Sequence, residues 1–146
     1  MQKPFIKSAK IALVLVYLVI IAGAVVRMTG SGMGCPDWPK CFGYYIPPTE
    51  ISELQFKPNH AYDKGIIIIK DEALLVATEH FNSSEILNLN NWESYTAHDY
   101  AQFNATHTWV EYINRLLGAL SGIPILIFTI LSFWLWRKNK WLTILS

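Results

Sequence analysis

The stretch Arg27-Met-Thr-Gly-Ser-Gly-Met-Gly-Cys35-Pro-Asp-Trp-Pro-Lys-Cys41-Phe-Gly43 follows directly on 16 uncharged residues, 11–26. Its three alternating glycines let the backbone approach a bound group closely, and two prolines stiffen the loop between the cysteines. Such a loop can be locked covalently in an oxidising compartment. The sequence therefore predicts a site built at the outer face of a membrane.

Two apolar runs predict transmembrane helices. The first span, taken as 11–28, is short for a hydrocarbon core of about 30 Å, but Lys10 can snorkel at its end. The second run, 116–136, has 21 residues without a charge and belongs to a predicted helix over 107–136. We therefore expect an all-α membrane protein with a long outer segment, 29–106, between its first two helices.

The distribution of charge predicts the orientation. All 11 acidic residues lie between Asp37 and Glu111, whereas the tail 1–10 and the segment 137–146 carry only basic charges. The positive-inside rule then places both ends in the cytoplasm and 29–106 outside. We expect the membrane to be a bacterial inner membrane. The net charge of +1 comes with no broadly basic face, which argues against nucleic acid as a partner.

Both ends of the chain carry a further signal. Residues 137–146 have the pattern of a cytoplasmic turn and the start of a third span, so we expect a fragment of a longer protein. At the other end, basic residues, an apolar run and Ala22-Gly-Ala24 also resemble a cleavable secretory signal. Because the apolar run continues through Val25 and Val26, we favour a retained helix.

The outer segment offers few clear patterns. Ala73, Leu74, Ala77 and Phe81 have helical spacing, and the segment 70–81 is therefore predicted to be an amphipathic surface helix. The run 66–69 is compatible with a short strand or with the entry to that helix, and periodicity does not decide between them.

Cys35 and Cys41 are the only cysteines in the chain. Outside the membrane they can form a disulfide, as a structural staple or as a redox-active pair, and free thiols are the third interpretation. A metal site around them is not expected, because no third and fourth ligands follow at the usual spacing.

A polar stripe leads into the second span. At about 100° per residue, one face of the predicted helix collects His107, Glu111, Asn114, Arg115, Gly118 and Gly122. The two glycines form a notch for close approach, and polar groups at this depth are costly unless they face a protein interior. The stripe is therefore expected to face inward.

The ionisable residues of the stripe, and Arg27 at the end of the first span, each have two interpretations. Glu111 is either an ion-pair partner of Arg115 or a catalytic, proton-handling carboxylate. Arg27 and Arg115 each fit simple snorkelling, but together they suggest a clamp for an anionic group such as a carboxylate. His107 could ligate a metal or heme iron, although a lone histidine at a helix entry is more often a surface residue.

The first stretch and the second motif, Glu111-Tyr-Ile-Asn114-Arg115-Leu-Leu-Gly118, together resemble the start of heme A synthase, a membrane enzyme of cytochrome oxidase assembly. The resemblance implies an eight-helix protein of two four-helix-bundle halves that oxidises a ring methyl of heme O to a formyl group, with heme B as cofactor. It implies a functional glutamate at Glu111 and an outer cysteine pair at Cys35 and Cys41.

One position departs from the family. The histidine of the family's Glu-x-x-His-Arg motif, an axial heme ligand, falls at Asn114, which puts ligation by this helix in doubt. We otherwise expect Arg27, Arg115 and Gly118 to contribute to heme binding, and the expected partners are heme, membrane lipid, heme O synthase or oxidase assembly proteins, and a second copy of the protein. The alternative is a non-enzymatic membrane assembly or interaction module that docks through its glycine notch.

Overall fold

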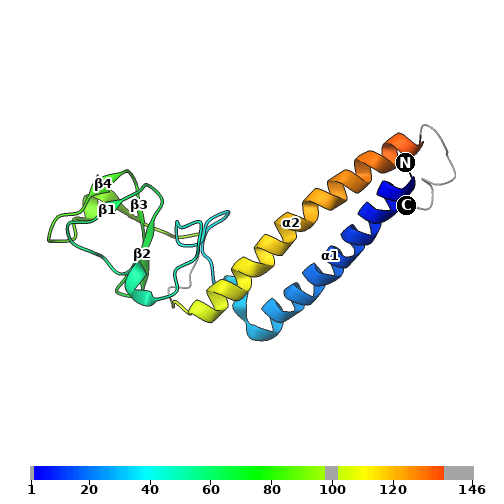
Figure 1. Ribbon diagram of the computed structural model, residues 1–146. Helices are drawn as coiled ribbons and strands as arrows, with labels where there is room; N and C mark the ends of the chain where they lie inside the picture. The colour runs from blue at the N-terminus through cyan, green and yellow to red at the C-terminus, as the bar shows by residue number, and fades with distance from the viewer. Residues whose placement is uncertain (1, 98–101, 137–146) are drawn as a thin grey trace. The chain divides into compact units, whose positions relative to one another are not determined.

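The computed structural model describes residues 2–97 and 102–136 (Figure 1). The chain divides into two compact units, one formed by Met1–Val25 with Ile113–Ser146 and the other by Val26–Tyr112. The first unit holds most of two long helices, and the second holds the outer segment with the adjoining helix ends. The turn and third span predicted over 137–146 lie outside the described residues.

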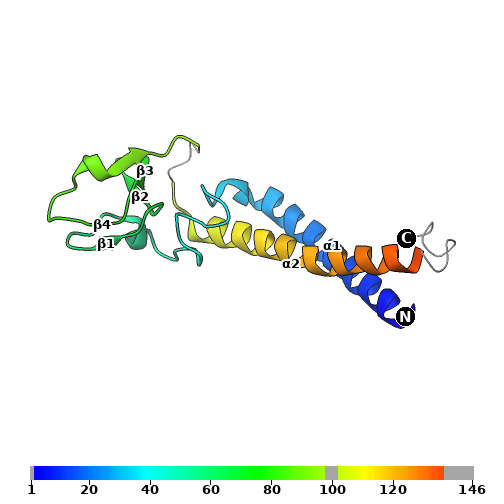
Figure 2. The ribbon, with the colours of Figure 1, turned by 90° about the horizontal axis from the view of Figure 1, so that it is seen from above.

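Both runs predicted to span the membrane are helical. Helix α1 comprises Gln2–Thr29 and helix α2 comprises Ala105–Trp136, and each is long and apolar enough to cross a bilayer. Within the first unit the helices lie side by side, and Phe5 stacks on Phe128 with ring centroids 5.0 Å apart (Figures 1 and 2). Most of their large aliphatic side chains are exposed, as expected for surfaces that meet lipid or further helices.

Local signals set the helix ends beside the outer segment. Helix α1 gives way to Gly30, which has φ 69°, a left-handed conformation that favours glycine. Asn104 caps α2, because its Oδ1 accepts a hydrogen bond of 3.2 Å from the backbone N–H of His107. This cap places Glu111 in the second turn of α2.

The outer segment contains β-structure, so the all-α prediction is wrong for this part of the chain. Strands β2 (Ile67–Lys70), β3 (Ala73–Ala77) and β5 (Trp92–Ser94) form an antiparallel sheet in the order β2-β3-β5. Strands β1 (Ala61–Tyr62) and β4 (Phe81–Asn82) pair separately, and short 3-10 helices cover Ser31–Met33, Ile51–Leu54 and Leu89–Asn91.

The amphipathic helix predicted over 70–81 is also wrong. Lys70 pairs with Ala73 across a two-residue turn in which Asp71 and Glu72 have φ 48° and 60°. Two positive φ values match the twist of a tight β-hairpin and are incompatible with a helix. The run 66–69 is consequently a strand for most of its length, which decides between the two interpretations left open by periodicity.

Burial on both faces of the sheet explains why the sequence pattern misled. Ile67 and Leu74 belong to a core cluster that also contains both cysteines. Ile68 and Leu75 belong to a second cluster with Trp92. A strand covered on both faces loses the alternation of apolar and polar residues that identifies a strand in a sequence.

The strained hairpin turn gives a stability prediction. Replacing Asp71-Glu72 by Asn-Gly should raise the stability of the outer segment by about 1 kcal/mol, because Asn and Gly adopt positive φ at lower cost. The measurement is thermal unfolding followed by tryptophan fluorescence. Glu85→Gly, at an exposed position without positive φ, is the control and should not stabilise. An unchanged midpoint for the Asn-Gly variant would contradict the turn geometry.

Candidate functional site

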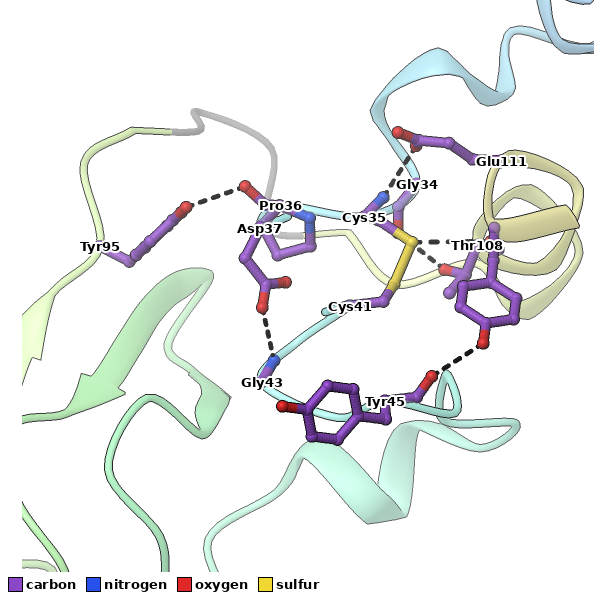
Figure 3. Close-up of a disulfide and its surroundings, with 11 residues drawn as sticks. Gly34, Cys35, Pro36, Asp37, Cys41, Gly43, Tyr45, Tyr95, Thr108 and Glu111 are labelled. Carbon is purple, nitrogen blue, oxygen red and sulfur yellow. Dashed lines mark hydrogen bonds between the residues drawn. A yellow bond between two sulfur atoms is a disulfide. The ribbon is translucent and has the colours of Figure 1, made fainter. Parts of the chain in front are cut away.

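The disulfide loop and the first two turns of α2 come together within the second unit (Figure 3). Cys35 and Cys41 form a disulfide, so the free-thiol interpretation is excluded for this structure. The two residues are 3% and 0% exposed and pack in a cluster with Phe42, Leu54, Ile67 and Leu74. A disulfide shielded in this way fits a structural staple better than a freely accessible redox pair.

Gly34 lets the loop touch the helix backbone. A Cβ atom at this position would lie 2.6 Å from both C and O of His107 and 2.7 Å from the backbone N of Thr108. No side chain fits at such distances, because the nearest atoms belong to the helix backbone and cannot move aside. The glycine before the first cysteine therefore sets how closely the loop approaches α2.

Two side chains of α2 hold the loop at this contact. The hydroxyl of Thr108 donates to the carbonyl oxygen of Gly34 at 2.8 Å, and the backbone N–H of Cys35 donates to Oε2 of Glu111 at 2.9 Å (Figure 3). Thr108 is fully buried and Glu111 is 7% exposed. Buried polar groups are stabilising only when paired in this manner, so these hydrogen bonds define the contact.

Further contacts fix the rest of the loop. Asp37 accepts a hydrogen bond from the backbone N–H of Gly43 at 2.9 Å, which closes the loop on itself. The hydroxyl of Tyr112 donates to the carbonyl of Tyr45 at 2.9 Å, which is a further contact with α2. The loop is thus held at several points along its length.

Tyr95 ties the loop to the chain that follows the sheet. Its hydroxyl donates to the carbonyl oxygen of Pro36 at 2.9 Å. Burial raises the pKa of the Tyr95 phenol, and the nearby charge of Asp37 raises it further. At neutral pH the phenol therefore keeps the proton that this hydrogen bond requires.

The predicted site residues are only partly brought together. Glu111, Cys35 and Cys41 meet at the contact described above. Arg27 lies in the last turn of α1, whereas Asn114, Arg115 and Gly118 lie in α2 beyond the second unit. The anionic clamp of Arg27 and Arg115 therefore stays a prediction.

His107 gains no support as a metal ligand. The contacts described above involve its main chain, because its C and O atoms pack against Gly34 and its backbone N–H donates to Asn104 Oδ1. In the described ranges 2–97 and 102–136, no group of three or more His, Cys, Asp and Glu side chains could hold a metal ion.

Sequence reasoning missed Thr108 and the role of Gly34. Thr108 lies three residues before Glu111, and this spacing puts both on one face of a helix. That spacing could have drawn attention to Thr108, but its partner lies 74 residues away in the sequence and is a backbone carbonyl. No residue pattern encodes such a partner.

Comparison with known proteins identifies the family. The family described as cytochrome oxidase assembly protein, COX15-CtaA, matches residues 8–82, more than half of the chain. The chain belongs to this family. The resemblance to heme A synthase inferred from the two motifs is thereby confirmed.

Several relatives of this COX15-CtaA protein are named heme A synthase. The Shewanella oneidensis protein is 49% identical over 45 residues, covering 31% of this chain and 14% of the relative. The Geobacillus thermodenitrificans protein is 36% identical over 70 residues, covering 47% of this chain and 22% of the relative. The Orientia tsutsugamushi protein is 28% identical over 144 residues, covering 96% of this chain and 33% of the relative. The chain thus spans a third or less of these relatives, and no solved structure matches it significantly.

The close approach at Gly34 gives a second prediction. Gly34→Ala should displace the loop from α2 and lower stability by about 1–3 kcal/mol, because the added methyl overpacks a rigid backbone contact. Thermal unfolding of the detergent-solubilised protein measures the loss. Gly32→Ala is the matched control, since its Cβ would meet only Val26 Cγ1 at 3.7 Å. Equal stability of the two variants would show that the contact is not tight.

Proposed function

We propose that this protein acts in heme A biosynthesis, in the oxidation of a ring methyl of heme O to a formyl group within the membrane. Its membership of a family with relatives named heme A synthase supports this proposal. The observation that carries it to particular residues is the buried carboxylate of Glu111, held on the disulfide loop at the outer end of α2.

Glu111 is our candidate catalytic residue. A carboxylate at the entry of a membrane span is costly to keep there and is therefore expected to serve a function. Its Oε2 already accepts one hydrogen bond, from Cys35, which fixes the orientation of the carboxylate. We propose that this carboxylate accepts and returns a proton during methyl oxidation, as a positioned acid–base group can.

The residues of α2 do not fit axial ligation of a heme B cofactor at the family's ligand position. Asn114 offers a carboxamide there in place of an imidazole nitrogen. We therefore assign heme B no ligand at position 114. Arg27, Arg115 and Gly118 remain proposed contacts for the carboxylate groups and the ring of the substrate heme.

The membrane arrangement is part of the same proposal. We propose that α1 and α2 belong to a four-helix half of a bundle in a bacterial inner membrane. Both termini would lie in the cytoplasm and the segment 29–106 outside. The confinement of all acidic residues to 37–111 supports this orientation, as does a disulfide in that segment. Heme, lipid, heme O synthase, oxidase assembly proteins and self-association are the proposed interactions.

The catalytic proposal is tested by Glu111→Gln in the full-length protein. The variant keeps the shape of the side chain and an oxygen for the Cys35 N–H, but an amide cannot accept and return a proton at neutral pH. We expect normal accumulation with heme A reduced by about 100-fold or more and heme O increased, measured by chromatography of heme extracts. Glu93→Gln, an exposed glutamate in β5, is the control and should behave as wild type. Near-normal heme A from Glu111→Gln would refute the catalytic role.

Wild-type protein that makes no heme A but retains specific membrane partners would favour the alternative function, a non-enzymatic assembly module.

The orientation is tested by labelling single cysteines from outside the cell. Because Cys35 and Cys41 are joined, the native pair can stay in place during alkylation. Pro4→Cys and Thr96→Cys both add a thiol at an exposed position without changing charge. We expect a membrane-impermeant maleimide to modify Thr96→Cys and to leave Pro4→Cys unmodified until the cells are opened. The reverse pattern would overturn the topology.

A further inference from the structure

Two of the hydrogen bonds between the loop and α2 belong to a single peptide unit. Its carbonyl, from Gly34, accepts from Thr108 Oγ1 at 2.8 Å, and its N–H, from Cys35, donates to Glu111 Oε2 at 2.9 Å. Because a peptide unit is planar and rigid, holding both its C=O and its N–H restricts its orientation strongly. Each bond also polarises the unit in the direction that strengthens the other bond.

The Thr108 hydroxyl serves the loop and not its own helix. A threonine within a helix commonly donates to the carbonyl four residues earlier, and here that carbonyl, of Asn104, is the acceptor for the Thr108 backbone N–H. The Thr108 hydroxyl reaches Gly34 instead, at a fully buried position. Removing the Thr108 hydroxyl would take this donor from the buried Gly34 carbonyl, and the loss of the hydrogen bond lowers the stability of the contact.

The disulfide lies directly beside this arrangement. Cys35 supplies the N–H of the clamped peptide unit, and its Sγ lies 3.7 Å from the carbonyl oxygen of Thr108. The same residue is therefore held by Glu111 through its backbone and by Cys41 through its side chain. Opening the disulfide would therefore allow the Cys35 N–H to move away from Glu111, and loss of the hydrogen bond to Glu111 would allow Cys35 to move relative to Cys41.

We infer that Thr108 is a positioning residue that fixes the Gly34–Cys35 peptide unit beneath Glu111, and so couples the Glu111 carboxylate to the closed state of the Cys35–Cys41 loop. Coupling of this kind is reciprocal. Contacts that hold the loop on α2 favour the disulfide over the open dithiol, and a closed disulfide keeps the Cys35 N–H on Glu111. The consequence for heme oxidation rests on the function proposed above, whereas the consequence for the disulfide does not.

The first arm of the test measures the disulfide equilibrium of the full-length protein in detergent. Samples are equilibrated in mixtures of reduced and oxidised dithiothreitol, and free thiols are then trapped with a maleimide and counted by mass spectrometry. Thr108→Val keeps the shape of threonine but removes the donor, and it should shift the equilibrium toward the dithiol about tenfold, or about 30 mV. Thr108→Ser restores the hydroxyl and should return the equilibrium to the wild-type value.

Controls separate the hydroxyl from general effects of substitution. Thr106→Val makes the same change at an exposed position two residues earlier in α2 and should leave the equilibrium unchanged. Glu111→Ala removes the acceptor at the other end of the peptide unit and should also favour the dithiol. Because both residues hold one unit, the double variant Thr108→Val with Glu111→Ala should shift the equilibrium by less than the product of the single effects.

The outcomes decide the inference in each case. A wild-type equilibrium in Thr108→Val, or an equal shift in Thr108→Ser, would overturn it, and so would independent effects in the double variant. If Thr108→Val does not accumulate, a wild-type equilibrium in Glu111→Ala overturns it equally.

The second arm measures heme extracts from cells carrying Thr108→Val. We expect heme O to rise and heme A to fall, with recovery in Thr108→Ser. Normal heme A beside a shifted disulfide equilibrium would overturn the positioning role. Absence of heme A from wild-type cells would refute the proposed function, while the first arm would still decide the coupling.

Discussion

The contact between the Gly34–Cys35 peptide unit and the first two turns of α2 joins the disulfide loop to a helix that is long and apolar enough to cross a membrane. The contact exists because Gly34 has no side chain and because Thr108 and Glu111 present a donor and an acceptor one turn apart. Its two hydrogen bonds bridge sequence separations of 74 and 76 residues. Closing so large a loop carries a substantial entropic cost, which the buried contacts of the outer segment must offset.

The sheet of the outer segment supports that contact from the other side. The cluster that holds the disulfide includes Ile67 of β2 and Leu74 of β3, so the loop is part of the core of the sheet. The backbone N–H of Ile67 also donates to the carbonyl oxygen of Phe42 at 3.1 Å. The disulfide thus lies between the sheet and the start of α2, and its burial follows from being covered by both.

At position 114 this chain has an asparagine where the resemblance to the family predicts a heme-ligating histidine. The family match covers residues 8–82, which include the disulfide loop, and the buried carboxylate of Glu111 in α2 contacts that loop. A carboxamide at residue 114 lacks the nitrogen lone pair that an imidazole gives to iron. Our proposal for this helix therefore rests on the Glu111 carboxylate and its hydrogen bond from the Cys35 N–H.

The sequence by itself determined the features that depend on local composition. Length and absence of charge identified both long helices, and the two close cysteines form a disulfide, as one of the interpretations of the sequence expected. The motif residues around Cys35 and Glu111 were also sufficient to indicate the family. Only the tertiary structure decided that 67–77 is a hairpin and that Thr108 and Gly34 belong to the site. The physical reason is that both results depend on residues that are distant in the sequence. Burial of both faces of the hairpin removes the alternation of apolar and polar residues by which a strand is identified. Every residue has a backbone carbonyl, so the sequence does not indicate which carbonyl accepts a hydrogen bond from Thr108.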